Sequence, residues 1–337
     1  DRGVSMGYDK AVMRAALGQY RADKDARESR RREKIQALYS RVPRLEEISR
    51  ELRSTAAHAV AAAFRTGNDP APLVEALSRE SLALQRERAE LLVEAGLPYD
   101  FLEEKPACAL CGDEGFTDQG PCRCLLAYYS REQNRELSKM LDLGAQSFDT
   151  FNFRLYDDTP WPGLGKSPRQ AMEKIYDECR DYAREFGRLR TNLFFTGAPG
   201  LGKTFLSACI AREVSDHGFS VVYDTAAHIF QQFESGKFGR ENPFEEDPDR
   251  EVNRYLNCDL LIMDDVGTEM LTSFVQSAFY RIVNDRLVNR RKTVLSTNLP
   301  MTELERRYGM AAASRIRGEY QMLRFFGEDI RVLKRDR

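Results

Sequence analysis

The chain has 337 residues, 42% of them hydrophobic and 31% charged, which predicts about two folded domains and excludes a collagen-like fibre or a wholly disordered chain. Its 51 basic and 53 acidic residues give a formal net charge of −2, so binding to nucleic acid would require a local basic patch. No run of about 18 apolar residues is present and residues 1–10 lack the apolar centre of a signal peptide, so we expect a cytoplasmic protein that does not bind a membrane.

Residues 10–94 show the periodicity of α-helices. Apolar side chains recur at steps of three and four, as at Leu45 and Ile48, among many good helix formers. We expect two or three helices, with breaks at Pro43 and across residues 66–72, where glycine, asparagine and proline oppose helix continuation. The charged surface of this region is either the solvated face of a helical spacer or part of a module that binds a partner.

Four of the seven cysteines lie in one short segment, as a CxxC pair and a CxC pair: Cys108, Cys111, Cys122 and Cys124. A glycine-containing loop separates the two pairs, so the segment could wrap one Zn²⁺ ion with four thiolates. The alternatives are four unconnected cysteines or a redox CxxC motif, which should open a helix after a strand, whereas turn residues flank this one. We therefore predict a zinc module. The remaining cysteines are expected to be small core residues: Cys179, Cys209 and Cys258.

From Thr191 onward, short apolar runs alternate with amphipathic segments. The strand-like runs are TNLFFTG, SVVYD, DLLIMDD and KTVLSTN. Strands separated by helices predict a parallel sheet covered on both faces.

The first of these strands runs into a glycine-rich loop and then into a helical pattern, which is the setting of a P-loop. The loop comprises Gly197, Ala198, Pro199, Gly200, Leu201, Gly202, Lys203 and Thr204. Backbone N–H groups of such a loop, together with the helix N-terminus, bind phosphate. We expect Lys203 to reach the β- and γ-phosphates of ATP and the Thr204 hydroxyl to bind Mg²⁺.

Two further strand-like runs end in polar residues that suit a nucleotide site. Asp264 and Asp265 follow an apolar run, and carboxylate oxygens are ligands that Mg²⁺ prefers. We expect Asp264 to bind Mg²⁺ directly or through water, and Asp265 to polarise the attacking water. Asn298 ends the last run, where its amide would orient water or sense the γ-phosphate. The sequence therefore predicts an ATPase.

The segments GAPGLGKT, LLIMDD, LSTN and SRIR resemble those of the AAA+ ATPases, and DDVGTE, STN and GEDIR make the chain similar to bacterial replicative helicase loaders of the DnaC/DnaI type and their IstB-like relatives. The resemblance implies an α/β P-loop fold with a RecA-like parallel sheet and no C-terminal helical lid. The expected divisions are a helical partner-binding region at residues 1–100, a zinc module at 101–126, a linker helix at 127–147 and an AAA+ ATPase domain at 148–337.

The resemblance also implies roles for individual residues. The Walker A contacts would be Lys203 and Thr204, the Walker B acids Asp264 and Asp265, and the sensor 1 residue Asn298. Arg315 would be an arginine finger that reaches the ATP of a neighbouring subunit, with Arg317 as the less favoured choice, and Arg331 would be the sensor 2 residue. The alternative for each arginine is a surface salt bridge. Asp265 stands where AAA+ proteins usually have glutamate, so we expect slow or partner-dependent hydrolysis.

Helicase loaders resemble one another in holding single-stranded DNA on the inner face of an ATPase assembly, and single strands are held by basic and aromatic side chains. Two segments of the chain are candidates for this contact. The first offers Lys237, Phe238 and Arg240, and the second offers Thr272 and Phe274. An ordinary surface loop and an ordinary helix start with a core phenylalanine remain equally good readings of the two segments.

We therefore expect an ATP-dependent DNA replication protein that self-associates through its ATPase domain, binds a hexameric replicative helicase and loads it onto single-stranded DNA. Its cofactors would be ATP, Mg²⁺ and Zn²⁺. Two alternatives stay open. One is an IstB-like ATPase that regulates a transposase on duplex DNA, and the other is a nucleotide-gated protein-binding switch with negligible turnover.

Overall fold

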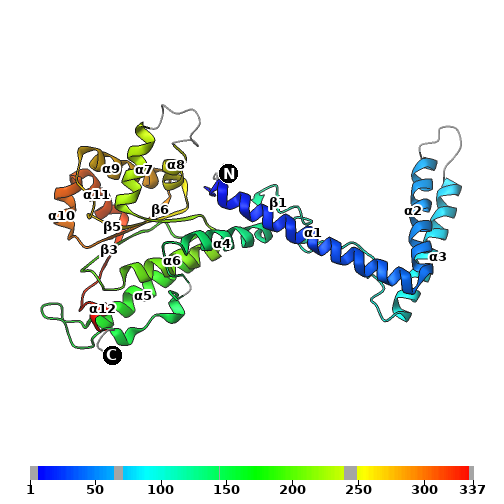
Figure 1. Ribbon diagram of the computed structural model, residues 1–337, viewed down its shortest axis with the longest axis horizontal. Helices are drawn as coiled ribbons and strands as arrows, with labels where there is room; N and C mark the ends of the chain where they lie inside the picture. The colour runs from blue at the N-terminus through cyan, green and yellow to red at the C-terminus, as the bar shows by residue number, and fades with distance from the viewer. Residues whose placement is uncertain (1–6, 64–70, 144, 239–248, 334–337) are drawn as a thin grey trace. The chain divides into compact units, whose positions relative to one another are not determined.

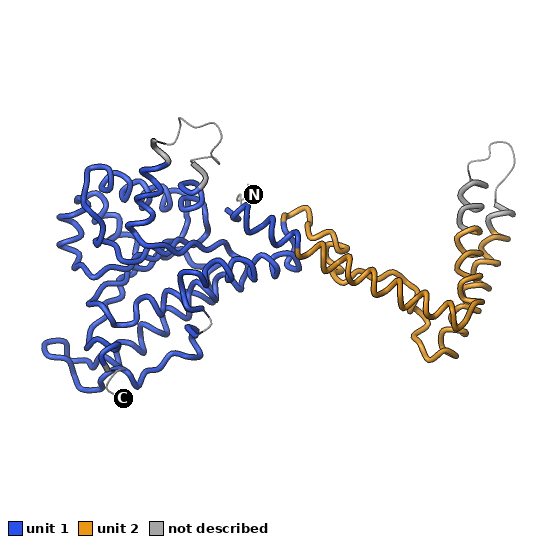
Figure 2. Tube along the Cα trace, viewed as in Figure 1, with its two compact units in different colours: residues 1–18, 121–337 blue, residues 19–120 orange. Residues whose placement is uncertain are grey.

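The computed structural model of the chain describes residues 7–63, 71–143, 145–238 and 249–333 (Figure 1). Contacts between residues divide the chain into two units, one made of residues 1–18 and 121–337 and the other of residues 19–120 (Figure 2). Each unit has its own buried apolar core. Among the described residues, no helix combines the length and the apolar character needed to cross a membrane.

The unit of residues 19–120 is mainly helical. Its helices are α1 (Lys10–Arg41), which begins in the other unit, α2 (Pro43–Ala63) and α3 (Ala71–Glu94). The predicted break at Pro43 is confirmed, because α1 ends at Arg41 and Pro43 is the first residue of α2. Proline has no backbone N–H, and at the first position of a helix an N–H would have no partner within the helix. Of the second predicted break, residues 66–70 lie outside the described residues.

Side chains from all three helices form the core of this unit. Leu38, Leu45 and Leu92 are buried together. Between α2 and α3, Arg44 donates two hydrogen bonds to the Glu87 carboxylate, from Nε at 2.8 Å and from Nη2 at 3.0 Å. The predicted helical character of this region is therefore confirmed, with three helices. A short pair of strands, β1 (Phe116–Thr117) and β2 (Gly120–Pro121), follows them.

The other unit contains a five-stranded parallel sheet in the order β4–β5–β6–β3–β7. Its strands are β3 (Asn192–Thr196), β4 (Val221–Thr225), β5 (Leu260–Val266), β6 (Lys292–Thr297) and β7 (Tyr320–Arg324). The first four confirm the predicted strands, whereas the sequence pattern does not predict β7. The connections from β3 and from its neighbour β6 leave in opposite directions, and open α/β sheets bind ligands at such a point, outside the carboxyl ends of the strands.

Helices cover both faces of this sheet, as the alternation of strands and helices predicts (Figure 1). One face carries α5 (Pro168–Arg184) and α6 (Lys203–Asp216), and the other carries α7 (Ala226–Phe238), α8 (Asp249–Asn257), α9 (Ser273–Val288), α10 (Met301–Tyr308) and α11 (Met310–Glu319). Along β3, Leu193 and Phe195 pack with α5 and α6, while Phe194 packs with α7 and α9. All three are fully buried, which is the pattern of a central parallel strand. Three short elements complete the unit: the 3-10 turns η1 (Phe148–Thr150) and η2 (Phe153–Leu155), and α12 (Ile330–Leu333).

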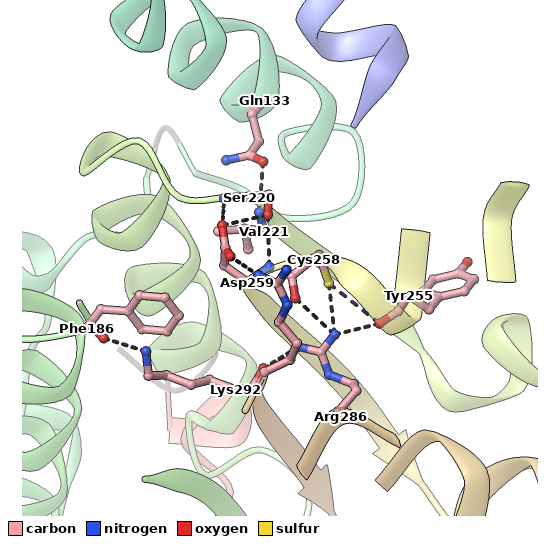
Figure 3. Close-up of polar contacts among 10 residues, drawn as sticks. Gln133, Phe186, Ser220, Val221, Tyr255, Cys258, Asp259, Arg286 and Lys292 are labelled. Carbon is pink, nitrogen blue, oxygen red and sulfur yellow. Dashed lines mark hydrogen bonds and ion pairs between the residues drawn. The ribbon is translucent and has the colours of Figure 1, made fainter. Parts of the chain in front are cut away.

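The helix α4 (Arg123–Leu137) is fixed to this unit by a buried polar side chain. Gln133 is 3% exposed and accepts a hydrogen bond from the Val221 N–H at 2.8 Å (Figure 3). It also donates a hydrogen bond to Ser215 Oγ at 2.7 Å. These contacts join α4 to the end of α6 and to the start of β4. The predicted linker helix at residues 127–147 is thus part of the sheet unit, which begins before the predicted boundary at residue 148.

A buried guanidinium ties together the segments around the amino-terminal ends of the strands. Arg286 on α9 is fully buried and donates a hydrogen bond to the backbone oxygen of Tyr255 at 2.7 Å (Figure 3). It also donates one to Thr293 Oγ1 at 2.9 Å. A buried guanidinium is tolerated only when acceptors such as these satisfy its N–H groups. The three predicted core cysteines are buried as expected: Cys179, Cys209 and Cys258.

Candidate functional site

The glycine-rich loop joins β3 to α6 in the predicted strand–loop–helix order. Gly200 has a φ of +74°, and a Cβ built there would lie 1.8 Å from Asp329 Oδ1. The Ile330 N–H donates to the Gly200 oxygen at 3.0 Å, so the segment that leads into α12 packs directly on the loop. The backbone angle therefore requires glycine at this turn, and a larger residue would also displace the Asp329 carboxylate.

Lys203 lies under the loop and contacts the end of β6. It is 6% exposed, and its Nζ donates to the oxygens of Gly197 at 2.7 Å and Ala198 at 2.8 Å. A third hydrogen bond, of 2.8 Å, goes to Asn298 Oδ1. Burial lowers the pKa of Lys203, while the two carboxylates at the end of β5 act in the opposite direction. The structure thus brings together the predicted Walker A lysine and the predicted sensor 1 amide.

Asp264 ends the buried part of β5 and contacts the first turn of α6. It is 2% exposed, and its Oδ2 accepts a hydrogen bond from Thr204 Oγ1 at 2.9 Å. The same oxygen accepts a second hydrogen bond, of 2.8 Å, from the Tyr223 hydroxyl on β4. A hydroxyl and a carboxylate side by side form the oxygen-rich donor set that suits Mg²⁺. Tyr223 carries no motif, so the sequence does not single it out.

The next residue, Asp265, has a backbone conformation that residues other than glycine rarely adopt. Its φ is +53°, in the left-handed region, and the pairing of β5 with β6 shifts register between Met263 and Val266. Such a bulge redirects a side chain, and here the carboxyl group is exposed. Partial burial and the charge of Asp264 raise its pKa above the ordinary value of 3.8. The exposed carboxyl therefore holds a proton more readily than an isolated aspartate does.

An apolar cavity of about 450 Å³ lies beside the loop. Its lining residues are Thr150, Phe151, Asn152, Leu155, Tyr156, Phe205 and Ile330. The Tyr156 hydroxyl donates to the Leu201 oxygen at 3.2 Å, and Phe205 directly follows Thr204, so the cavity adjoins the loop. Its volume and apolar walls suit a flat ring system. The sequence offers only a cluster of aromatic residues there, so sequence reasoning missed it.

The three candidate arginines have different surroundings. Arg331 on α12 follows Ile330, whose N–H donates to the Gly200 oxygen of the loop, and it forms a surface ion pair with Asp329 at 3.7 Å. The Arg315 guanidinium lies 5.8 Å from the centre of the Tyr280 ring on α9. Arg317 forms an ion pair with Glu305, which is the surface salt bridge of the alternative reading.

The DNA candidates divide between described and undescribed parts of the chain. Thr272 caps α9 by accepting a hydrogen bond from the Val275 N–H at 3.2 Å, and Phe274 packs against the core. Both therefore have a structural role, and their contact with DNA stays a prediction. The side chains of Lys237 and Phe238, at the end of α7, and the whole of Arg240 lie outside the described residues.

The four cysteines of residues 108–124 come together as predicted. Their sulfur atoms all lie within 4.8 Å of one another. Tetrahedral zinc with Zn–S bonds of about 2.3 Å requires sulfur separations of about 3.8 Å, so the thiolates fit this ion with small adjustments. The turn is held by Asp113, whose carboxylate accepts hydrogen bonds from the N–H groups of Ala107 at 2.9 Å and Cys108 at 2.8 Å. The N–H of Gly115 donates a hydrogen bond to Cys111 Sγ at 3.3 Å.

Part of the chain, including the residues of this site, matches a known protein family. Residues 175–316 match the model of the family described as IstB-like ATP binding protein, and they include the glycine-rich loop, Asp264 and Asn298. This segment is similar to the IstB-like ATP-binding domain. The predicted resemblance to that group is confirmed for the segment, and ATP binding is the property that the family description carries.

Known relatives are replication proteins by name. The chain is 30% identical over 140 residues to the replicative helicase loader DnaC of Escherichia coli K12, a match that covers 42% of this chain and 56% of the relative. It is 28% identical over 148 residues to the DnaC of Buchnera aphidicola subsp. Baizongia pistaciae, covering 44% of this chain and 59% of the relative. Among solved structures, a DnaC helicase loader matches with a TM-score of 0.43 and 20% identity, over 55% of this chain and 99% of that one. The chain thus spans less than two thirds of the curated relatives it matches.

Proposed function

We propose that this chain is an ATPase of a helicase-loading assembly, which binds a hexameric replicative helicase and loads it onto single-stranded DNA. The observation that carries the ATPase part is the meeting of Lys203, Thr204, Asp264 and Asn298, which come from three strand ends and are linked by direct hydrogen bonds. No fold requirement demands a lysine, a hydroxyl, a carboxylate and an amide in that arrangement. Nucleoside triphosphate with Mg²⁺ is the ligand that uses all four.

In this proposal each side chain has a definite part. The loop N–H groups and Lys203 hold the phosphates, and Thr204 and Asp264 hold Mg²⁺. When bound there, Mg²⁺ would supply positive charge beside the phosphate oxygens. Asp265 accepts a proton from the attacking water and Asn298 orients that water. The apolar cavity beside the loop would take the base, with Asn152 at its wall as a polar partner.

The loading part of the proposal rests on the names of the relatives and on the helical unit of residues 19–120. The DnaC proteins that match are named as replicative helicase loaders. The helices and the cysteine module of residues 19–124 would hold the helicase, and Arg315 would reach the nucleotide of a second copy of the chain. Zn²⁺ would hold the four cysteine thiolates in one fold and take no part in the chemistry.

One observation favours a second candidate function. The matching family model is described as IstB-like, so regulation of a transposase on duplex DNA remains the rival. The third reading, a switch with negligible turnover, would follow if Asp265 were too poor a base to support hydrolysis.

A single series of experiments separates the three. Phosphate release is measured for the full chain alone, with single-stranded DNA, with duplex DNA and with a hexameric helicase. We expect Mg²⁺-dependent turnover that single-stranded DNA or the helicase stimulates. Lys203→Ala should abolish turnover, and Lys174→Ala, at a lysine that is 73% exposed on α5, is the control that should not. Stimulation by duplex DNA alone would favour the transposase regulator, and nucleotide binding without turnover under every condition would favour the switch.

A further inference from the structure

The carboxylate of Asp264 is held by a tyrosine that belongs to no nucleotide-binding motif. Tyr223 lies on β4, where it pairs in register with Ile262 of β5, two residues before Asp264. Its hydroxyl donates to Asp264 Oδ2 at 2.8 Å, the oxygen that also accepts from Thr204 Oγ1 at 2.9 Å. One carboxylate oxygen therefore receives two protein donors, from two different elements.

The other oxygen of this carboxylate is also paired. Asp264 Oδ1 accepts a hydrogen bond of 2.9 Å from the Asp265 N–H, which the left-handed backbone of Asp265 brings into reach. Asp264 is 2% exposed and Tyr223 is 8% exposed, so neither side chain has space to turn toward water. The hydroxyl is the donor in this pair, because an ionised carboxylate oxygen can only accept a hydrogen bond.

We propose that Tyr223 is a positioning residue for the magnesium site: its hydroxyl fixes the orientation of the Asp264 carboxylate before the cation and nucleotide arrive. This inference rests on the proposed function of Asp264 as a Mg²⁺ partner. Groups that orient a metal-binding carboxylate contribute to affinity because the carboxylate no longer has to be ordered when the ion binds. Tyr223 acts through Asp264 and does not touch the reacting atoms, so it is not a catalytic residue.

The same unit offers a matched control. Tyr255 on α8 is 1% exposed and donates its hydroxyl to Oδ2 of Asp224 at 2.6 Å. Asp224 is 4% exposed and lies near the end of β4, where His228 is its other side-chain partner. The Tyr255 pair has the same chemistry and burial as the Tyr223 pair, but its carboxylate does not contact Thr204. Removing either hydroxyl takes one donor from a buried carboxylate, so both changes should lower stability to a similar extent.

The test compares Tyr223→Phe and Tyr255→Phe with the wild-type full chain. Binding of a fluorescent, non-hydrolysable ATP analogue is titrated with Mg²⁺, and binding of Mn²⁺ to the nucleotide complex is followed by electron paramagnetic resonance. We expect Tyr223→Phe to require about 10-fold more Mg²⁺ for half-maximal nucleotide binding and to bind Mn²⁺ correspondingly more weakly. Saturating Mg²⁺ should restore nucleotide binding. Tyr255→Phe should leave both curves unchanged while its unfolding temperature falls as much as that of Tyr223→Phe.

Two outcomes would overturn the inference. One is a Mg²⁺ curve of Tyr223→Phe that equals that of the wild type, and the other is an equal shift in Tyr255→Phe, which would show a general loss of rigidity. The proposed function fails in a different way. In that case the wild-type chain itself would bind the nucleotide without any dependence on Mg²⁺.

Discussion

Replacing Asp265 by glycine should stabilise the sheet unit and abolish turnover at the same time. The φ of Asp265 is +53°, and a side chain in this left-handed region costs roughly 1–2 kcal/mol that glycine does not incur. Glycine loses about 0.5–1 kcal/mol of this gain because its unfolded chain is freer. The backbone alone therefore predicts a net stabilisation of about 0.5–1 kcal/mol.

The charge of Asp265 adds to this effect at neutral pH. Partial burial and Asp264 raise its pKa above the ordinary value of 3.8, so the folded state binds the proton more tightly than the unfolded state does. Stability is then lost as the pH rises from below 3.8 through the raised pKa, and the loss persists at pH 7. Removal of the carboxyl group should therefore stabilise the protein further at neutral pH, and this part of the gain should disappear in acid.

Thermal unfolding and phosphate release measure the two effects on the same samples. Turnover of Asp265→Gly should fall by roughly 10²–10⁴, the usual contribution of a general base. Asp265→Asn isolates the charge, because asparagine also tolerates the left-handed region. Arg290→Gly is the control for the backbone, since Arg290 has a φ of +54° at an exposed turn before β6, and it should gain stability with turnover unchanged. A less stable Asp265→Gly, or one that hydrolyses ATP at the wild-type rate, would refute this reasoning.

Three further predictions concern the metal module, the arginine finger and the cavity. Elemental analysis of reduced protein should find about one zinc per chain and much less in Cys111→Ser, and a folded wild-type chain without metal would contradict the site. Arg315→Ala should bind ATP but lose turnover by roughly 10³, whereas Arg317→Ala should behave as wild type. Mixed with Lys203→Ala chains, Arg315→Ala should regain some phosphate release, and co-assembled mixtures that regain none would exclude a finger acting between subunits. Phe151→Ala should weaken ATP binding by about 10-fold without affecting inorganic triphosphate, as calorimetry can show, and equal losses for both ligands would rule out a base in the cavity.

The strands β3 to β6 and the loop after β3 could be predicted because their signals are local. A short apolar run followed by glycines or carboxylates identifies a buried strand end whatever the rest of the chain does. The strand β7 has no such signal. Gln321, Met322 and Arg324 are exposed, so the apolar pattern is weak, and α11 ends at Glu319 directly before β7 begins at Tyr320. Its pairing partner is β3, more than 100 residues earlier, and that pairing is decided by packing.

The position of α4 shows the same limit. The expected division predicts a linker helix at residues 127–147, but the attachment of α4 depends on Gln133 contacting Val221 and Ser215, which lie 88 and 82 residues further along the chain. A polar residue on a helix usually faces water, so nothing in the local sequence distinguishes this one. Tertiary contacts make this helix part of the sheet unit.

The residues of the candidate site also fall into two groups, those that the sequence identifies and those that only the tertiary structure shows. Motif spacing alone identifies Lys203, Thr204, Asp264 and Asn298, because a phosphate loop and a strand-end carboxylate need particular residue types at particular local positions. Neither the hydroxyl of Tyr223 on Asp264 nor the left-handed turn at Asp265 can be read from spacing, because both depend on which strands are neighbours and in what register. The side chains expected to bind the nucleotide and the cation are identified by local sequence motifs. The side chains that fix the orientation of these binding residues are brought to the site by the packing of distant segments.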